Sequence, residues 1–419
     1  MDKIVIEGGR PLKGRVKVGG SKNSALPLMA ATLLTSKKVV LSNVPDLADV
    51  KTMLRLLQAL GVQTRSLFGR VNFAATKIKK NEAPYDMVRR MRASVLVLGP
   101  LLARTGLARV SLPGGCAIGA RPINLHLAAL EKMGAKIKLA EGYVEAKCKR
   151  LKGARIVFEK VTVTGTENIM MAAALAKGTT VLENAAREPE IVDLANLLRK
   201  MGAQITGDGT SQITIEGVDE LSGATHRVIP DRIEAGTFMV AAAMTRGDVV
   251  IEDIDPLHVD ALSQKLRDAG AEVQVQNDQA RVIGPKVVRP VDVITDPYPG
   301  FATDLQAQFM ALMAIAAGTS TITETIFENR FMHVPELKRL GADLKIKGNT
   351  VVVKGVEHLN AAPIMASDLR ASACLVLAGL ASKGVTEIHR VYHIDRGYES
   401  IEKKLRKLGA RIRRAKVKY

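Results

Sequence analysis

One short stretch of the chain combines a thiol with residues that loosen the backbone. Residues 112–122 read LPGGCAIGARP, so Cys116 directly follows two glycines and precedes Arg121 by five residues. Glycine reaches backbone conformations that other residues avoid, so we expect a loop that moves. An unperturbed thiol has a pKa of about 8.5, and a nearby guanidinium lowers that pKa. Cys116 is therefore predicted to act either as a general acid or as a nucleophile.

Several cationic or amide side chains lie at the predicted starts of buried helices or in loops. They are Lys22, Asn23, Arg92 and Arg370 at helix starts, with Arg121, Arg330 and Arg396 in loops. The amino-terminal end of a helix carries partial positive charge, so a cation placed there completes an anion site. Guanidinium groups add two-pronged recognition of carboxylate or phosphate. As a set, these residues predict a substrate with more than one anionic group.

Acidic residues fall at the starts of the last three buried helices. They are Asp231, Glu234, Asp304 and Asp368. N-capping of a helix explains such acids and is the default interpretation. Asp304 has a second one, because a carboxylate among cations stays ionised and can take a proton from a hydroxyl group.

Other kinds of site find little support. The glycine-rich stretch lacks the Lys-Ser/Thr ending of a phosphate loop, and no GxGxxG opens a helix after a strand. His389 and His393 are four residues apart but have no carboxylate at metal-binding spacing. Cys148 and Cys374 are interpreted as small apolar residues of a strand and a helix, and the three cysteines show no disulfide or zinc pattern. No metal or cofactor is predicted.

The charge balance permits a second class of function. The formal net charge is +19, which suits nucleic acid, an anionic membrane or small acidic ligands. Nucleic acid is the less favoured partner, because there is no Trp and only 3% of residues are aromatic. No apolar run reaches the length of a membrane span and no secretory signal is apparent, so we expect a soluble cytoplasmic protein.

A sixfold repeat organises the elements that must position these residues. An amphipathic helix that ends in glycine and leads into an alternating strand occurs six times, at intervals of 68 to 73 residues. The glycines are Gly61, Gly134, Gly202, Gly270, Gly341 and Gly409. Between them lie six segments rich in small apolar residues, which we expect to form buried helices. The pattern predicts an α/β protein of six units of about 70 residues, three in each of two domains that meet near residues 227–238.

Several stretches resemble one family over nearly the whole chain. They are GGSKNSALP, PYDMVRRMRAS, LPGGCAIGARP, NAAREPEIVD, PDRIEAGTF, FATDLQAQF, FENRFMHVPEL, SDLRASA and YHIDRGYE. The chain is thereby similar to the UDP-N-acetylglucosamine 1-carboxyvinyltransferases. The resemblance implies a two-domain inside-out α/β barrel, with an N-terminal lobe of residues 22–229 that carries the Cys116 loop. Residues 1–21 and 230–419 would form the C-terminal lobe.

The resemblance also implies a reaction. The enolpyruvyl group of phosphoenolpyruvate would pass to the 3-hydroxyl of UDP-N-acetylglucosamine by addition and elimination, with release of phosphate, in the first committed step of peptidoglycan synthesis. Cys116 would protonate the methylene carbon, form thiol adducts and be the target of fosfomycin. Asp304 would accept the hydroxyl proton. Lys22, Arg121 and Arg396 would hold the phosphate, with Asn23 and Arg370 nearby, and no cofactor is implied.

The sugar nucleotide has its own set of implied contacts. They are Arg92, Arg121, Pro122, Ile123, Asn124, Leu125, Lys160, Val161, Thr162, Val163 and Ile326. Asn124 departs from the family pattern, which commonly has an acidic residue there, and the strong positive charge is also unusual. The rival hypothesis is a polyanion-binding protein that has kept the fold and lost the activity.

Overall fold

The computed structural model describes residues 2–89, 91–112 and 123–416. Contacts between residues divide the described chain into two compact units, which we treat separately. The N-terminal unit contains residues 20–112 and 123–229, and the C-terminal unit contains residues 2–19 and 230–416. The first two strands therefore belong to the unit that also holds the end of the chain.

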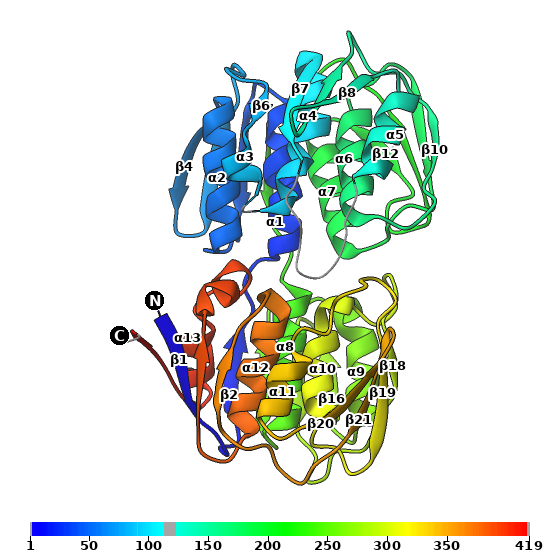
Figure 1. The fold of residues 1–419 in the computed structure, drawn as a ribbon. Coiled ribbons are helices and arrows are strands. Elements are labelled where there is room, and N and C mark those ends of the chain that lie inside the picture. Colours follow the sequence, from blue (N-terminus) through cyan, green and yellow to red (C-terminus); the bar gives the residue numbers. More distant parts are fainter. Residues whose placement is uncertain (1, 90, 113–122, 417–419) are drawn as a thin grey trace. The chain divides into compact units, whose positions relative to one another are not determined.

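Each unit contains three four-stranded sheets in its described residues (Figure 1). In the N-terminal unit the sheets are β14(Ala224–Arg227)-β3(Lys38–Ser42)-β5(Arg70–Ala74)-β4(Gln63–Leu67), β6(Glu82–Ala83)-β7(Leu107–Ser111)-β9(Tyr143–Lys147)-β8(Lys136–Ala140) and β10(Arg155–Val157)-β11(Thr179–Glu183)-β13(Gln212–Glu216)-β12(Gln204–Thr206). In the C-terminal unit they are β16(Glu272–Gln276)-β17(Gln279–Ile283)-β15(Asp248–Glu252)-β2(Lys13–Lys17), β18(Val293–Ile294)-β19(Thr319–Thr323)-β21(Thr350–Lys354)-β20(Asp343–Lys347) and β22(Pro363–Met365)-β23(Val385–His389)-β1(Asp2–Glu7)-β24(Arg411–Lys416). The predicted sixfold repeat is thus confirmed, with three repeats in each unit.

Helices lie in the interior of each unit, as their composition predicts. The inner helices are α1(Lys22–Ala31), α4(Leu98–Thr105) and α6(Val163–Ala173) in one unit, and α8(Arg232–Met244), α10(Gln306–Met313) and α12(Leu369–Ala381) in the other. Helices α8, α10 and α12 contact one another, and nearly all their residues are buried (Figure 1). A helix that is apolar on every side gains most when it is enclosed in this way.

The amphipathic helices form a second set. They are α2(Ala48–Leu60), α5(Asn124–Lys132), α7(Pro189–Lys200), α9(Asp260–Asp268), α11(Val334–Arg339) and α13(Ile401–Lys407). All six repeat glycines that follow them have positive φ, between 86° and 108°. An L-residue with a side chain rarely adopts such a conformation, so the spacing of these glycines marks the helix ends correctly.

The second inner helix is shorter than its sequence predicts. The run ASVLVLGPLLART begins as a 3₁₀-helix, η2(Arg92–Val97), and becomes α-helical only from Leu98. The amide of Gly99 donates to Asn168 Oδ1 at 2.7 Å, and Pro100 has no amide hydrogen to give. Both features take donors out of the regular helical pattern, which explains the change of helix type.

Candidate functional site

Asp304 lies between two buried arginines of the C-terminal unit. It belongs to the 3₁₀-helix η4(Thr303–Leu305), directly before α10. Its Oδ1 accepts from Arg330 Nη2 at 2.6 Å, and its Oδ2 accepts from Arg370 Nη2 at 2.8 Å and from Nε at 3.1 Å. The default interpretation of Asp304 as an N-cap is wrong, since its carboxylate binds these side chains and Ala302 occupies the cap position of η4. The carboxylate therefore forms ion pairs with two guanidinium groups.

The guanidinium of Arg370 is fixed from a second side by a phenol. Its Nη1 donates to the Tyr398 hydroxyl at 3.2 Å, and that hydroxyl lies 2.8 Å from Thr237 Oγ1. Burial lowers the pKa of Arg370, but the charges of Asp304, Tyr398 and Asp231 and the hydrogen bond to Asp304 together outweigh burial, so the net shift is upward. Burial also raises the pKa of Tyr398, so the phenol stays protonated and able to donate or accept. The arrangement holds Arg370 as a permanent cation in a fixed orientation.

Glu324 connects the Asp304 turn with the turn that contains Ile326. Its Oε1 accepts from the Ile326 amide at 2.8 Å and from the Thr295 hydroxyl at 2.9 Å. Its Oε2 accepts from the Thr303 hydroxyl at 2.8 Å. The role of Glu324 could not be read from the sequence, because nothing in the motif FENR indicates that the acid two residues before Ile326 folds back onto another turn.

The other acidic residues at these helix starts bind different groups. Asp231 and Asp368 accept from backbone amides in the first turns of α8 and α12, so their interpretation as N-caps is confirmed. Glu234 is not a cap: its carboxylate accepts from the Gly19 amide and from Lys404 Nζ, both at 2.7 Å.

Arg396 ends the 3₁₀-helix η5(Val391–Arg396), which packs against α12. Burial lowers the pKa of His393, and the charge of Arg396 lowers it further. Arg396 therefore adds a positive charge near His393, in addition to the charges of Arg330 and Arg370 beside Asp304.

Lys22 is the first residue of α1 in the N-terminal unit. Ser21 caps the helix by accepting from the Ser24 amide at 3.3 Å, and Asn23 follows Lys22 within the same turn. Lys22 Nζ lies 3.4 Å from Asp49 Oδ2 of α2. The helix start thus carries a partly buried ammonium, as the sequence predicts.

Among the described residues of this unit, the helix starts implied for the sugar nucleotide lie beside His126 of α5, because α6 contacts both α5 and η2. His126 Nδ1 lies 3.1 Å from Asn168 Nδ2 of α6, and its Nε2 lies 3.4 Å from Thr164 Oγ1. Burial lowers the pKa of His126 to about 4, and the charge of Arg92 in η2 contributes to the same shift. This histidine is therefore neutral at pH 7.

Two helix starts meet at this histidine. Helix α5 begins with Asn124 and Leu125 after a buried Ile123, and the segment from Lys160 to Val163 leads into α6. Thr162 caps α6 by accepting from the Gly165 amide at 3.2 Å. Two helix amino termini and one arginine in one region suit an anionic group such as a diphosphate.

Three predicted site residues lie outside the described residues, namely Cys116, Arg121 and Pro122. The other two cysteines are described. Cys374 is completely buried, and burial raises the pKa of its thiol well above the ordinary value. Cys148 is half-buried just after β9, and its Sγ donates to the Arg150 carbonyl. Its place after the strand corrects the prediction that it lies within one.

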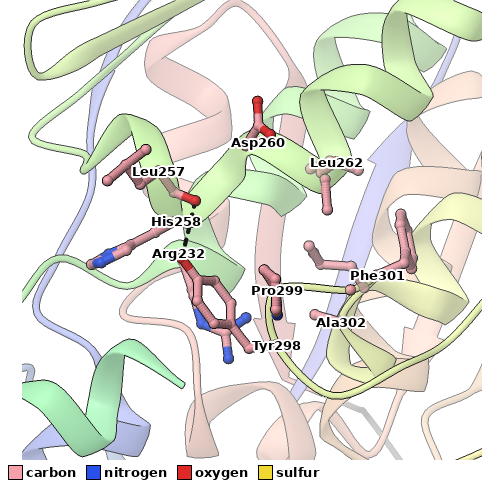
Figure 2. A pocket seen from close by; sticks show the side chains of 12 residues that line it. Arg232, Leu257, His258, Asp260, Leu262, Tyr298, Pro299, Phe301 and Ala302 are labelled. Atoms are coloured by element: carbon pink, nitrogen blue, oxygen red, sulfur yellow. Dashed lines mark hydrogen bonds between the residues drawn. The ribbon is translucent and has the colours of Figure 1, made fainter. Parts of the chain in front are cut away.

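A pocket of about 200 Å³ lies in the C-terminal unit close to the Asp304 turn. Figure 2 shows Tyr298, Pro299 and Phe301 on one side and Leu257 and Leu262 on the other. Leu305, the residue after Asp304, also lines it, and Arg232 lies with its guanidinium 5.7 Å from the centre of the Tyr298 ring. This pocket could not be predicted from the sequence, because its lining comes from separate segments of two repeats.

A group of buried carboxylates was also missed. Glu167, Glu188 and Glu190 of the N-terminal unit are each at most 8% exposed. Burial raises the pKa of Glu167 well above its ordinary value, and the charges of the other two raise it further. Within the described ranges, no group of three or more His, Cys, Asp or Glu side chains is arranged to hold a metal ion. No helix among the described residues is long and apolar enough to cross a membrane.

Comparison with known proteins places these residues in a family. The family model of EPSP synthase (3-phosphoshikimate 1-carboxyvinyltransferase) matches residues 6–405. The chain belongs to this family. Its fold is accordingly the two-domain inside-out α/β barrel of six repeats.

Individual relatives cover the whole length. The UDP-N-acetylglucosamine 1-carboxyvinyltransferase of Geotalea daltonii is 61% identical over 414 residues, which are 99% of each chain. The enzyme of the same name from Geobacter metallireducens is 60% identical over 416 residues, 99% of this chain and 100% of that one. Among solved structures, the enolpyruvyl transferase NikO from Streptomyces tendae superposes with a TM-score of 0.87 at 27% identity and covers 99% of this chain and 98% of its own. EPSP synthase from Acinetobacter baumannii, at 19% identity and a TM-score of 0.78, covers 99% of this chain and 100% of its own and shares the fold alone.

Proposed function

We propose that this protein transfers the enolpyruvyl group of phosphoenolpyruvate to the 3-hydroxyl of UDP-N-acetylglucosamine and releases phosphate. The observation that carries the proposal is identity of about 60% over nearly the full length to several enzymes of that name. The described cationic residues support it, since both substrates are anionic. The reaction is the first committed step of peptidoglycan synthesis, and its place in the cell is proposed to be the cytoplasm.

The chemistry is addition followed by elimination. The sugar oxygen attacks the central carbon of phosphoenolpyruvate while a proton is added to its methylene carbon, and loss of phosphate with a methyl proton then restores the double bond. We assign protonation of the methylene carbon to Cys116 and the proton of the sugar hydroxyl to Asp304. The negative oxygens of the reactant would be neutralised by cations instead of by a metal.

Phosphate binding is assigned to Lys22, Arg121 and Arg396, with Asn23 and Arg370 beside them. The ammonium of Lys22 at the start of α1 and the fixed cation of Arg370 support this assignment. Arg330 would contribute by holding Asp304 in place. These roles fall on both units, so the reaction requires each of them.

Nucleotide binding is assigned to Arg92, Arg121, Pro122, Ile123, Asn124, Leu125, Lys160, Val161, Thr162, Val163 and Ile326. The helix starts of α5 and α6 and the neutral state of His126 support a site for the diphosphate and its sugar. Asn124 contributes no charge there, so it can bind the nucleotide only as a neutral hydrogen-bonding group.

A phosphate-release assay tests the proposal. The purified protein should release phosphate from phosphoenolpyruvate only when UDP-N-acetylglucosamine is present. Release that depends on shikimate 3-phosphate, or no release with either acceptor, would contradict it. Steeply salt-dependent binding to DNA without turnover would instead support the polyanion-binding alternative.

The role of Cys116 has its own test. Replacement by serine should nearly abolish turnover, because a hydroxyl group is a far weaker acid than a thiol. An epoxide that mimics phosphoenolpyruvate, such as fosfomycin, should label Cys116 in the wild-type protein. The buried Cys374 and the hydrogen-bonded Cys148 serve as internal controls. Labelling of either control in place of Cys116 would refute the assignment.

A further inference from the structure

Four polar side chains of the N-terminal unit form a chain from the surface to the first turn of α1. Lys200 Nζ lies 3.0 Å from His226 Nδ1, and His226 Nε2 lies 2.7 Å from Asp193 Oδ1. The hydroxyl of Ser24 donates to Asp193 Oδ2. Ser24, Asp193 and His226 are at most 5% exposed, whereas Lys200 is at the surface.

The positions of the hydrogens follow from the chemistry of the end groups. An ammonium can only donate, so His226 Nδ1 must accept from Lys200. The ring hydrogen is then on Nε2, where it is donated to Asp193. The carboxylate accepts at both oxygens, from His226 at one and from Ser24 at the other. Lys200 and His226 thus orient Asp193.

Asp193 ties together the two segments through which the chain passes out of this unit. Its Oδ2 accepts from the Ile229 amide at 3.3 Å as well as from Ser24. The Ser21 amide in turn donates to the Ile229 carbonyl at 2.7 Å. The unit begins at residue 20 and ends at residue 229, so a single buried carboxylate holds both of its ends.

Lys22 and Asn23 lie between two residues, Ser21 and Ser24, that these hydrogen bonds hold in place. Ser21 on one side binds Ile229, and Ser24 on the other binds Asp193, while α7, which carries Asp193, packs against α1. We propose that Asp193, oriented by His226 and Lys200, is a positioning residue that sets Lys22 and Asn23 for the anionic substrate. This inference rests on the function proposed above and adds to it a role for residues that touch no substrate.

The variants Asp193→Asn and Ser24→Ala test whether Asp193 positions Lys22 and Asn23. An asparagine must point its amide N–H at a donor on one of its two sides, and an alanine removes the hydroxyl donor alone. Either change should raise the KM for phosphoenolpyruvate by about tenfold and change the KM for UDP-N-acetylglucosamine less. The matched control is Thr32→Val at the other end of α1, where a buried hydroxyl donates to the Met29 carbonyl at 2.7 Å.

A second measurement does not depend on turnover. The side chain of Lys22 is 13% exposed, and its rate of acetylation, followed by mass spectrometry, should rise severalfold in both variants but not in Thr32→Val. Lys51, whose side chain is 55% exposed, provides the internal standard. If the wild-type protein releases no phosphate, the proposed function fails and the labelling alone decides the positioning role.

The proposal would be overturned if Ser24→Ala and Asp193→Asn behaved like Thr32→Val, with a lower melting temperature but unchanged KM values and unchanged labelling of Lys22. Ser24→Ala decides the matter if Asp193→Asn does not fold, because it leaves the buried charge and its histidine partner in place.

Discussion

Replacement of Asp304 by alanine should destabilise the C-terminal unit as well as stop catalysis. The side chains of Arg330 and Arg370 are 7% and 4% exposed, and Asp304 forms an ion pair with each of them. Removal of one partner from a buried ion pair typically costs about 3–5 kcal/mol, because the remaining charge stays in a poorly solvated place. Asp304 is itself 24% exposed, so we expect a loss of about 3 kcal/mol, at the lower end of that range.

Urea unfolding measures this loss. A unit of this size has an m-value of about 2 kcal/mol/M, so a loss of about 3 kcal/mol lowers the midpoint by about 1.5 M. The chain has no Trp, so circular dichroism is the suitable signal. Hydrogen exchange followed by mass spectrometry then assigns the loss, which should appear in peptides of α10 and α12 and not in those of α1 or α6.

Two further variants sharpen the test. Asp304→Asn keeps one oxygen acceptor and should lose less stability than Asp304→Ala. Combining Asp304→Ala with Arg330→Met should recover part of the loss, because one unpaired cation is removed. An unchanged urea midpoint for Asp304→Ala, or a purely additive double variant, would refute the view that this carboxylate neutralises two buried cations.

Three other expectations concern stability. Burial lowers the pKa of His126 and of His333 to about 4, below the ordinary value of 6.5. The free energy of unfolding of each unit should therefore fall by up to about 3 kcal/mol as the pH falls from 6.5 to 4, which urea unfolding at several pH values measures. Burial raises the pKa of Glu167, so the wild-type protein loses stability as the pH rises above the unfolded value of about 4.5; Glu167→Gln should raise the urea midpoint at pH 8 more than at pH 5. Thr162→Ala removes the cap of α6 and should cost about 1 kcal/mol, with a higher KM for UDP-N-acetylglucosamine in the phosphate-release assay.

The repeat architecture could be predicted because its signals are local. A glycine after each amphipathic helix and an apolar composition of each inner helix depend on neighbouring residues alone, and all six glycines adopt the expected positive φ. The break in the second inner helix was missed, since it depends on Asn168, which is 69 residues away from Gly99. Signals of that range are invisible in a single sequence.

The same limit, that contacts between distant residues leave no local signal, applies to the functional site. The prediction that Asp304 lies among cations is confirmed, but its partners, 26 and 66 residues away, could not be identified from the sequence. Its default interpretation as an N-cap failed for this reason, whereas that of Asp231 and Asp368 held because caps bind the next residues along the chain. The assignments of Cys116 and Arg121 remain predictions.

The pairing of Asp304 with two guanidinium groups has a consequence for the proposed reaction. A carboxylate that binds two cations is a poor proton acceptor, so Asp304 should not deprotonate a hydroxyl group while both arginines are engaged with it. If Arg370 binds phosphoenolpyruvate as proposed, the anionic oxygens of the substrate compete with Asp304 for that guanidinium group, and each hydrogen bond that Asp304 loses makes its carboxylate a stronger base. Bound phosphoenolpyruvate would thereby strengthen the base that acts on UDP-N-acetylglucosamine. In the proposed reaction, proton transfer would therefore be coupled to occupancy of the site by phosphoenolpyruvate.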